Sequence, residues 1–190
     1  AAIYAEQATL ANRPILRQGA NGKWYLQFDG ANDGLRSTYT TAFARDITVA
    51  LQWRTEDGGS HDSYMSAMSK NDGVSGNIGW LMGVKTTTRQ FGITTPGSAE
   101  IAYEASDSSD ATWYRGVITV ASAANALYTV YKNGVSVASA TTTNGQHGAS
   151  DVLVIGENSP TGASSWKGYI GHIVLVNGVL SAGQLALLDT

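Results

Sequence analysis

The sequence of 190 residues contains no cysteine and only three prolines. The absence of cysteine excludes a disulfide-stabilised scaffold, a thiol enzyme and a zinc site with cysteine ligands. Charged residues make up 14% of the chain, against about 25% in an average globular domain. The net charge is −3 and the chain has no basic cluster and no apolar run long enough to span a bilayer, so we predict neither nucleic-acid nor membrane binding.

Glycine is abundant, at 22 residues, and it separates short stretches in which apolar and polar residues alternate. In 23–29 the side chains of Trp24, Leu26 and Phe28 share one face, and 47–54 repeats the pattern with Trp53 on its apolar face. A period of two is typical of half-buried strands, so we expect Trp24 and Trp53 in the core. Similar strand-length runs occur at 64–70, 79–85, 89–94, 99–104, 112–120, 151–156 and 166–176.

The clearest local signal is Asn133-Gly134, which lies between two runs of β-forming residues. Both residues tolerate the positive φ angles of a type I′ turn, so a two-residue hairpin is predicted. Counting outward from the turn places Val130 opposite Val137 and puts Tyr128 on the same face. We expect that face to lie in the core.

A helical signal appears only near the C-terminus, where Ser181 and Gln184 form a capping box ahead of several leucines. About twelve strands and one short C-terminal helix predict an all-β fold, an antiparallel two-sheet β-sandwich of the jelly-roll type. Residues 1–22 are irregular and are predicted to form an N-terminal arm, laid across the sandwich or toward a neighbouring molecule. Residues 23–190 are predicted to form the single β-sandwich domain.

Three parts of the sequence share a pattern with a known family. The first is Trp24-Tyr-Leu-Gln-Phe28-Asp29-Gly30, with Asp33 shortly after it. The second is Thr112-Trp113-Tyr114 with the hairpin Tyr131-Lys-Asn-Gly-Val135, and the third is Gly168-Tyr-Ile170 with Val176-Asn-Gly-Val-Leu180-Ser181. They resemble concanavalin A-like, laminin-G-like jelly rolls of bacterial secreted proteins and tailed-phage virion proteins. The resemblance implies the same fold and a buried Trp113. It says little about function, because these are strand and turn elements.

The sequence departs from that family in the last strand, where relatives often carry one or two acidic residues. This chain has Gly171 and His172 instead, so a cation held by a last-strand carboxylate is not implied here. We expect His172 to be a partly buried histidine with satisfied hydrogen bonds rather than a catalytic one.

Glycoside hydrolysis is the less favoured alternative function. Glucanases of this fold carry Glu-x-Asp-x-Glu on one strand, which places alternate carboxylates about 6.5 to 7 Å apart on one face. The nearest match here is Glu100 and Glu104, which are roughly 13 Å apart if the strand is extended and have Ala102 between them. The sequence therefore predicts that the protein is not an enzyme.

Aromatic and polar residues next to loops are the candidate ligand-binding groups. Aromatic rings stack on sugar faces, and neighbouring amides and imidazoles hydrogen-bond to hydroxyl groups. The alternative is that the tryptophans among them close the ends of the sandwich and that the histidine lies in a solvated turn. The candidate carbohydrate-binding residues are His61, Tyr64, Asn77, Trp80 and Trp166.

We predict no cofactor, and calcium is the less favoured alternative, because oxygen-rich loops suit this hard cation. The candidate ligands are Glu56, Asp57 and Asp62 in one loop and Asp72 in another. Neither loop has the spacing of an EF-hand, and Asp and Asn residues also stabilise turns without any metal.

We therefore predict a non-enzymatic surface-recognition module. The first hypothesis is a structural or decoration component of a tailed-phage virion, in the capsid or the tail, that contacts other virion proteins or copies of itself. The alternative is a carbohydrate-binding, adhesin-like or lectin-like module of a viral or secreted bacterial protein that binds host-surface glycans. The predicted location is accordingly the phage particle surface or, alternatively, outside a bacterial cell.

Overall fold

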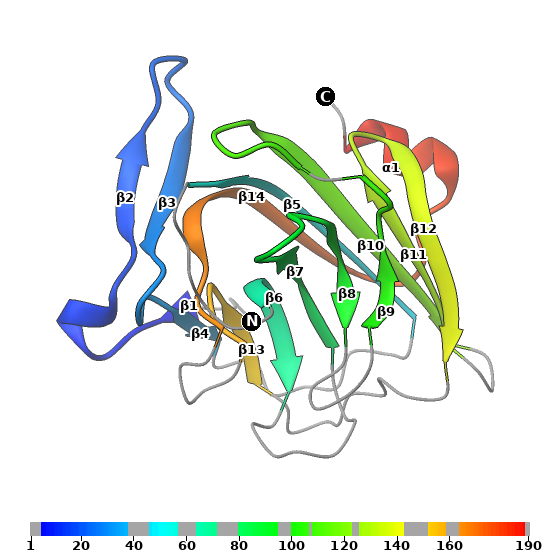
Figure 1. The fold of residues 1–190 in the computed structure, drawn as a ribbon, viewed down its shortest axis with the longest axis horizontal. Coiled ribbons are helices and arrows are strands. Elements are labelled where there is room, and N and C mark those ends of the chain that lie inside the picture. The colour runs from blue at the N-terminus through cyan, green and yellow to red at the C-terminus, as the bar shows by residue number, and fades with distance from the viewer. Residues whose placement is uncertain are drawn as a thin grey trace.

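The computed structural model describes residues 5–37, 46–56, 64–71, 80–94, 100–106, 108–122, 126–142, 152–158 and 164–188. Within these residues the chain forms fourteen β-strands, the short 3₁₀-helix η1 (Leu10–Asn12) and the α-helix α1 (Ala182–Leu187). The all-β fold with one short C-terminal helix is therefore confirmed (Figure 1).

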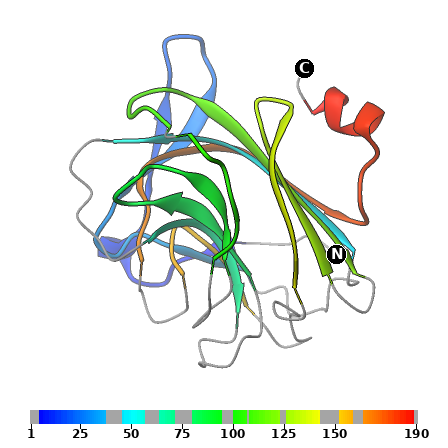
Figure 2. The ribbon, with the colours of Figure 1, turned by 45° about the vertical axis from the view of Figure 1, so that its right-hand side comes forward.

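The strands form two stacked sheets, and neighbouring strands pair antiparallel throughout, as predicted (Figures 1 and 2). Sheet A contains, in spatial order, β1 (Ala5–Glu6), β4 (Leu35–Ser37), β13 (Val152–Ile155), β6 (Tyr64–Asn71), β7 (Trp80–Lys85), β8 (Phe91–Thr94) and β9 (Glu100–Tyr103). Sheet B contains β12 (Val135–Thr142), β11 (Ala126–Lys132), β10 (Tyr114–Ser122), β5 (Ile47–Thr55), β14 (Lys167–Asn177), β3 (Trp24–Asp29) and β2 (Ile15–Gln18).

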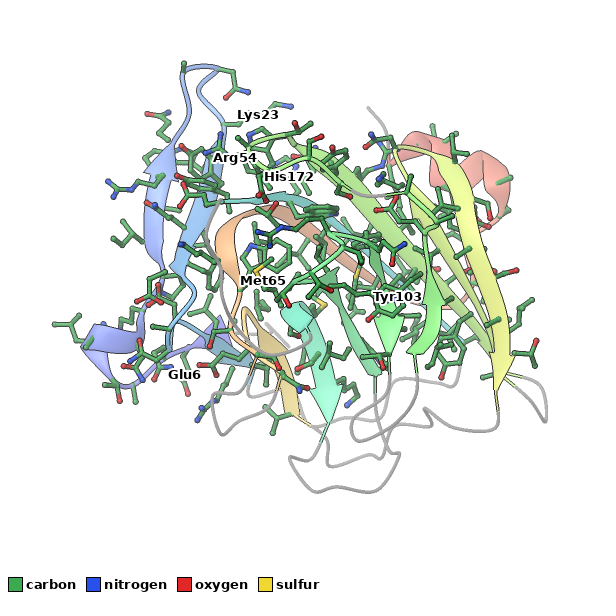
Figure 3. The ribbon with its side chains drawn as sticks, viewed as in Figure 1. Glu6, Lys23, Arg54, Met65, Tyr103 and His172 are labelled. Carbon is green, nitrogen blue, oxygen red and sulfur yellow. The ribbon has the colours of Figure 1, made fainter. Side chains whose placement is uncertain are left out.

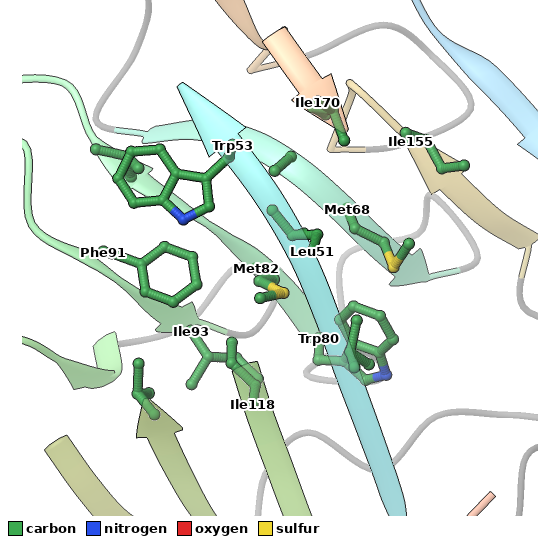
Figure 4. Close-up of a cluster of buried hydrophobic side chains, with 14 of the residues drawn as sticks. Leu51, Trp53, Met68, Trp80, Met82, Phe91, Ile93, Ile118, Ile155 and Ile170 are labelled. Carbon is green, nitrogen blue, oxygen red and sulfur yellow. The ribbon is translucent and has the colours of Figure 1, made fainter. Parts of the chain in front are cut away.

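The core lies between the two sheets, and the central strand β5 shows how the sequence builds it. Toward its C-terminal end β5 alternates: Trp53 and Thr55 are buried against sheet A, whereas Gln52 and Arg54 are partly exposed on the outer face of sheet B. Figure 4 shows Trp53 among the apolar side chains of both sheets. The alternation predicted for this strand is confirmed here.

The other end of β5 is buried on both faces because the C-terminal segment covers it. The Thr48 hydroxyl donates a hydrogen bond to the Gly178 carbonyl oxygen (2.8 Å) and accepts one from the Leu180 amide (3.0 Å). α1 follows directly, and its predicted capping box is confirmed by reciprocal bonds between Ser181 and Gln184. The outer face of sheet B is thus covered near Thr48 and polar near Arg54.

Among the described residues no helix is long and apolar enough to cross a membrane.

The predicted hairpin between β11 and β12 is present, with a shifted register. Asn133 and Gly134 have φ angles of 51° and 82°, as a type I′ turn requires. Lys132 lies opposite Val135 as the predicted register requires, but a bulge places Val130 opposite Ala138 rather than opposite Val137, so the predicted register is wrong from Val130 onward. A bulge adds one residue to one strand, and an alternating pattern does not reveal it.

The N-terminal segment differs from the irregular arm that was predicted. Strand β1 pairs with β4 at one edge of sheet A, and β2 pairs with β3 at one edge of sheet B. The described part of residues 1–22 therefore belongs to the sandwich. Contact of this segment with a neighbouring molecule stays a prediction.

Candidate functional site

Two tryptophans predicted to contact a ligand lie in the core instead. Trp80 is 1% exposed and Trp166 is fully buried, and Figure 4 shows Trp80 surrounded by apolar side chains. The Trp166 ring meets the Trp53 ring edge to face, with 5.9 Å between the ring centroids. A ring without an exposed face cannot stack on a saccharide, so the prediction of a ligand contact is wrong for both residues.

The other predicted site residues cannot be placed in the same way. Tyr64 begins β6 opposite Lys85, but its side chain lies outside the described part of the chain. Five further candidates lie wholly outside the described residues, and their roles stay predictions: His61, Asn77, Asp57, Asp62 and Asp72.

Two tryptophans predicted to be in the core are on the surface: Trp24 is 55% exposed and Trp113 is 41% exposed. Strand β3 pairs with β14 only from Leu26 to Asp29, so Trp24 lies in the part of the β2–β3 hairpin that extends past the sheet (Figure 1). Sheet A does not cover that part. Trp113 precedes the first residue of β10. The expectations of burial, from the strand pattern for Trp24 and from the resemblance for Trp113, are both wrong.

A β-bulge in β14 lies beside this hairpin. Ile170 pairs with Trp53 and Ile173 pairs with Leu51, so two residues, Gly171 and His172, lie opposite the single residue Gln52. His172 is exposed rather than partly buried as predicted. A Cβ atom on Gly171 would lie 3.2 Å from the Gln52 Cβ and 3.7 Å from the Trp113 ring, so the glycine leaves space beside both.

The diverging hairpin and the bulge together produce a pocket of about 620 Å³ on the outer face of sheet B. Its volume is in the range of small-molecule binding sites, about 300–1,000 Å³. Figure 3 shows Lys23 at the tip of the hairpin and Arg54 below it. The residues that line the pocket are Gly19, Ala20, Asn21, Lys23, Trp24, Tyr25, Gln52, Arg54, Trp113, Tyr114, Arg115, Asn133 and Gly171.

An aromatic cluster forms one wall of the pocket. The Tyr25 ring lies 5.6 Å from the Trp113 ring and 5.0 Å from the Tyr169 ring, centroid to centroid, and both pairs meet edge to face. The Arg54 guanidinium carbon lies 4.1 Å from the Tyr169 ring centroid and 5.8 Å from that of Trp113. These contacts fix the orientation of the Trp113 ring while 41% of the residue stays exposed.

Glu56, a predicted calcium ligand, takes part in this cluster. Its Oε1 lies 3.8 Å from the Arg54 Nη2, and its carboxylate accepts a hydrogen bond from the Tyr169 hydroxyl. That hydrogen bond raises the pKa of Tyr169, burial and the Glu56 charge add to the increase, and Arg54 opposes it. Within the described residues no group of three or more His, Cys, Asp or Glu side chains could hold a metal ion. Calcium binding stays a prediction.

Arg115 is held beside Gln52 on the floor of the pocket. The two residues pair across β10 and β5. The Arg115 amide donates to Asn133 Oδ1 (2.9 Å), and the Arg115 carbonyl oxygen accepts from the Asn133 amide (2.8 Å). The sharp Asn133-Gly134 turn therefore fixes the backbone of Arg115. Burial lowers the pKa of Arg115 because it penalises the charged guanidinium.

Glu104, one of the two carboxylates considered for hydrolysis, does not line this pocket. Glu104 is 1% exposed, and its Oε1 accepts hydrogen bonds from the Phe91 amide (2.9 Å) and the Ser108 hydroxyl (2.7 Å). Its Oε2 forms an ion pair with Lys132. These contacts hold β9, β8 and β11 together, which is a structural role.

The family model Laminin_G_3, described as the concanavalin A-like lectin/glucanases superfamily, matches residues 29–186. The chain belongs to this superfamily. A search of curated proteins finds no match. As a concanavalin A-like domain, the chain also resembles many solved structures at low sequence identity.

Three of these structures match this chain over most of the length of both chains. Domain 4 of AbnA, a GH43 extracellular arabinanase from Geobacillus stearothermophilus, in complex with arabinotriose, has a TM-score of 0.73 and 16% identity over 100% of this chain and 87% of that one. The SAP-like pentraxin of Limulus polyphemus has a TM-score of 0.61 and 17% identity, and the match covers 92% of this chain and 80% of the pentraxin chain. The CBM40 of the Ruminococcus gnavus IT-sialidase, bound to α2,3-sialyllactose, has a TM-score of 0.57 and 16% identity, and the match covers 80% of this chain and 86% of the CBM40 chain.

Similarity at this level of identity shows the concanavalin A-like fold alone. The Trypanosoma rangeli sialidase also matches, with a TM-score of 0.66, but this chain spans only 27% of its length. The position of a binding site in this chain therefore has to come from its own residues.

Sequence reasoning missed this pocket because five separate segments build it. The alternating pattern already placed Gln52 and Arg54 on the polar face of their strand and Tyr25 on the polar face of another. Combining those faces with the antiparallel strand order would have brought these residues together. The bulge at Gly171 and the divergence of the β2–β3 hairpin leave no comparable signal in the sequence.

Proposed function

We propose that this domain is a saccharide-binding module and that the pocket on the outer face of sheet B is its binding site. The observation that carries the proposal is the exposure of Trp113 and Trp24 at a pocket, in a protein that buries its other three tryptophans. Exposed aromatic rings provide a flat apolar surface for the C–H face of a sugar ring. The side-chain amides of Gln52, Asn133 and Asn21 lie around them and can hydrogen-bond to hydroxyl groups.

Two of the similar structures support this proposal. Among the similar structures, the arabinanase domain is described in complex with arabinotriose and the CBM40 module bound to α2,3-sialyllactose. Both are domains of comparable length to this chain, which covers 87% and 86% of them. The saccharides bound to these two similar domains therefore support a saccharide as the ligand of this domain.

Binding without bond cleavage is the simpler form of the proposal. Most glycoside hydrolases use a pair of carboxyl groups that flank the scissile bond. In the described part of the chain no Asp or Glu lines the pocket, and the nearby Glu56 is held by Arg54 and Tyr169. The virion role, the virion partners and the location on a phage particle stay predictions from the sequence resemblance.

A titration of tryptophan fluorescence against a panel of oligosaccharides tests the proposal. The panel contains arabinotriose, α2,3-sialyllactose, lactose, cello-oligosaccharides and trigalacturonate. Since two tryptophans line the pocket and three are buried, we expect a saturable change in emission with at least one sugar, confirmed by calorimetry. If no sugar on a broad panel binds by either method, saccharide binding is not the function of this pocket.

A further inference from the structure

Gly171 leaves a point of the backbone uncovered on the floor of the pocket. β14 pairs with β3 only as far as Ile170, so within the described residues no strand pairs with Gly171 on that side. On the other side the bulge places Gly171 and His172 opposite Gln52 alone. A glycine inside a strand often marks a place where a ligand approaches the backbone closely.

The fold itself does not require a glycine at this position. Gly171 is not one of the glycines with a positive φ angle. A Cβ atom on it would meet only side-chain atoms within 4 Å, the nearest being the Gln52 Cβ at 3.2 Å. Any larger residue would, however, fill the space between Gln52 and Trp113. The glycine therefore keeps the pocket open at this point.

The two sides of this space differ in chemistry. On one side is the Gln52 Oε1, which lies 3.3 Å from the position of the missing Cβ and is a hydrogen-bond acceptor. On the other side is the Trp113 Cζ3, at 3.7 Å, which belongs to the six-membered part of the indole ring. Tyr25 and Arg54 hold that ring in place. The space therefore suits a group that has both an apolar carbon and a hydroxyl donor.

The position beside the ring edge limits the shape of this group. A pyranose that stacks on the face of Trp113 can reach Gly171 only through a group that protrudes from the sugar ring. The exocyclic hydroxymethyl group is small, protrudes, and combines a carbon with a hydroxyl donor. A carboxylate in the same place would bring only acceptors to the Gln52 Oε1. A hydroxymethyl group thus fits this space better.

We propose that Gly171 is the specificity-determining residue of the pocket and that the space beside it takes the hydroxymethyl group of a hexopyranose. This inference rests on the proposed function and names the chemical class of the saccharide. The carbon of the group contacts the Trp113 ring, and its hydroxyl donates to the Gln52 Oε1. A pentopyranose lacks the group and binds without these contacts.

Calorimetry with matched pairs of sugars tests the proposal. Cellotriose and xylotriose differ only in their hydroxymethyl groups, and so do methyl β-D-galactopyranoside and methyl α-L-arabinopyranoside. One missing carbon group in a binding pocket weakens binding about tenfold or more. We therefore expect the hexose member of at least one pair to bind at least about tenfold more tightly than its pentose partner.

Variants identify the residue responsible. Gly171→Ala places a methyl group in the space, so the preference within the pair should disappear while the affinity for the pentose member stays the same. Gln52→Met keeps a long side chain without the acceptor and should reduce the preference several-fold. Urea denaturation of each variant checks that it is folded.

Gly183→Ala is the matched control for the glycine substitution. Gly183 is an exposed residue of α1 that does not line the pocket. A Cβ atom on it would meet nothing outside its own helix within 4 Å. We expect this variant to keep both the affinity and the preference of the wild-type protein.

The outcomes separate the two proposals. Equal affinities within each pair, tighter binding of the pentose member, or binding of other sugars but of neither pair overturns the hydroxymethyl inference while saccharide binding stands. An unchanged preference in folded Gly171→Ala overturns the role of Gly171. If that variant does not fold, an unchanged preference in Gln52→Met overturns the proposed contact. A failure of all four sugars and of the wider panel overturns the proposed function itself.

Discussion

Replacement of Trp113 by alanine is expected to weaken saccharide binding about ten- to hundredfold while the protein stays folded. Covering an exposed aromatic side chain contributes about 1.5–3 kcal/mol, and each 1.4 kcal/mol changes an affinity about tenfold. Trp113 is 41% exposed at the pocket and precedes the first residue of β10. Its removal therefore costs ligand contacts more than core contacts. Calorimetry measures the affinity, and urea denaturation measures the stability.

The control is Leu127→Ala on the same sheet. Leu127 is 44% exposed, close to the exposure of Trp113, and it does not line the pocket. We expect this variant to bind as tightly as the wild-type protein. Trp113→Phe, which keeps an aromatic ring, should retain most of the affinity. An unchanged affinity in Trp113→Ala, measured on folded protein, would contradict the assignment of this residue to the site.

Replacement of Trp80 by alanine should have the opposite effect, a large loss of stability with little change in affinity per folded molecule. Truncation of a buried tryptophan costs about 3–5 kcal/mol, out of a typical total stability of about 5–15 kcal/mol. Trp80 is 1% exposed in a strand whose two faces are both buried. The midpoint of urea denaturation should therefore fall sharply.

Trp24→Ala is the matched comparison, since the same substitution is made at a residue that is 55% exposed. We expect it to change the free energy of unfolding by less than about 1 kcal/mol, in the range of ordinary surface substitutions. If Trp80→Ala does not fold at all, Trp80→Phe provides a smaller cavity and a measurable loss. A Trp80 variant with unchanged stability and abolished binding would place that ring at the ligand instead of the core.

The fold was largely predictable because its strands alternate so regularly. Strand β5 shows why: its apolar residues lie two apart, and the buried face follows directly from that spacing. The strands that escaped prediction are β1, β2 and β4, which have two to four residues each. β1 and β4 are too short for a period of two to be detected. β2 is as long as the predicted strands β8, β9 and β13, but all four of its residues are exposed, so it has no buried face for the alternation to mark.

The site was less predictable for a related reason. Alternation indicates to which face a side chain belongs, but not whether the opposite sheet reaches it. Trp24 lies on the same face of β3 as Phe28, yet Phe28 is fully buried and Trp24 is 55% exposed, because the hairpin extends past the sandwich. Proximity to a predicted loop was an equally poor guide, since Trp80 and Trp166 both follow segments that the sequence predicts to be loops and both lie in the core.

The most direct test of the saccharide-binding site is a ¹H–¹⁵N correlation spectrum of the labelled protein, recorded during titration with the tightest-binding sugar of the panel. Each of the five tryptophans contributes one indole N–H signal. The account predicts that the signals of Trp113 and Trp24 shift, together with the backbone amides of Gln52, Arg115 and Gly171, while those of Trp53, Trp80 and Trp166 stay in place. Shifts confined to residues outside the pocket, with Trp113 and Trp24 unmoved, would contradict it.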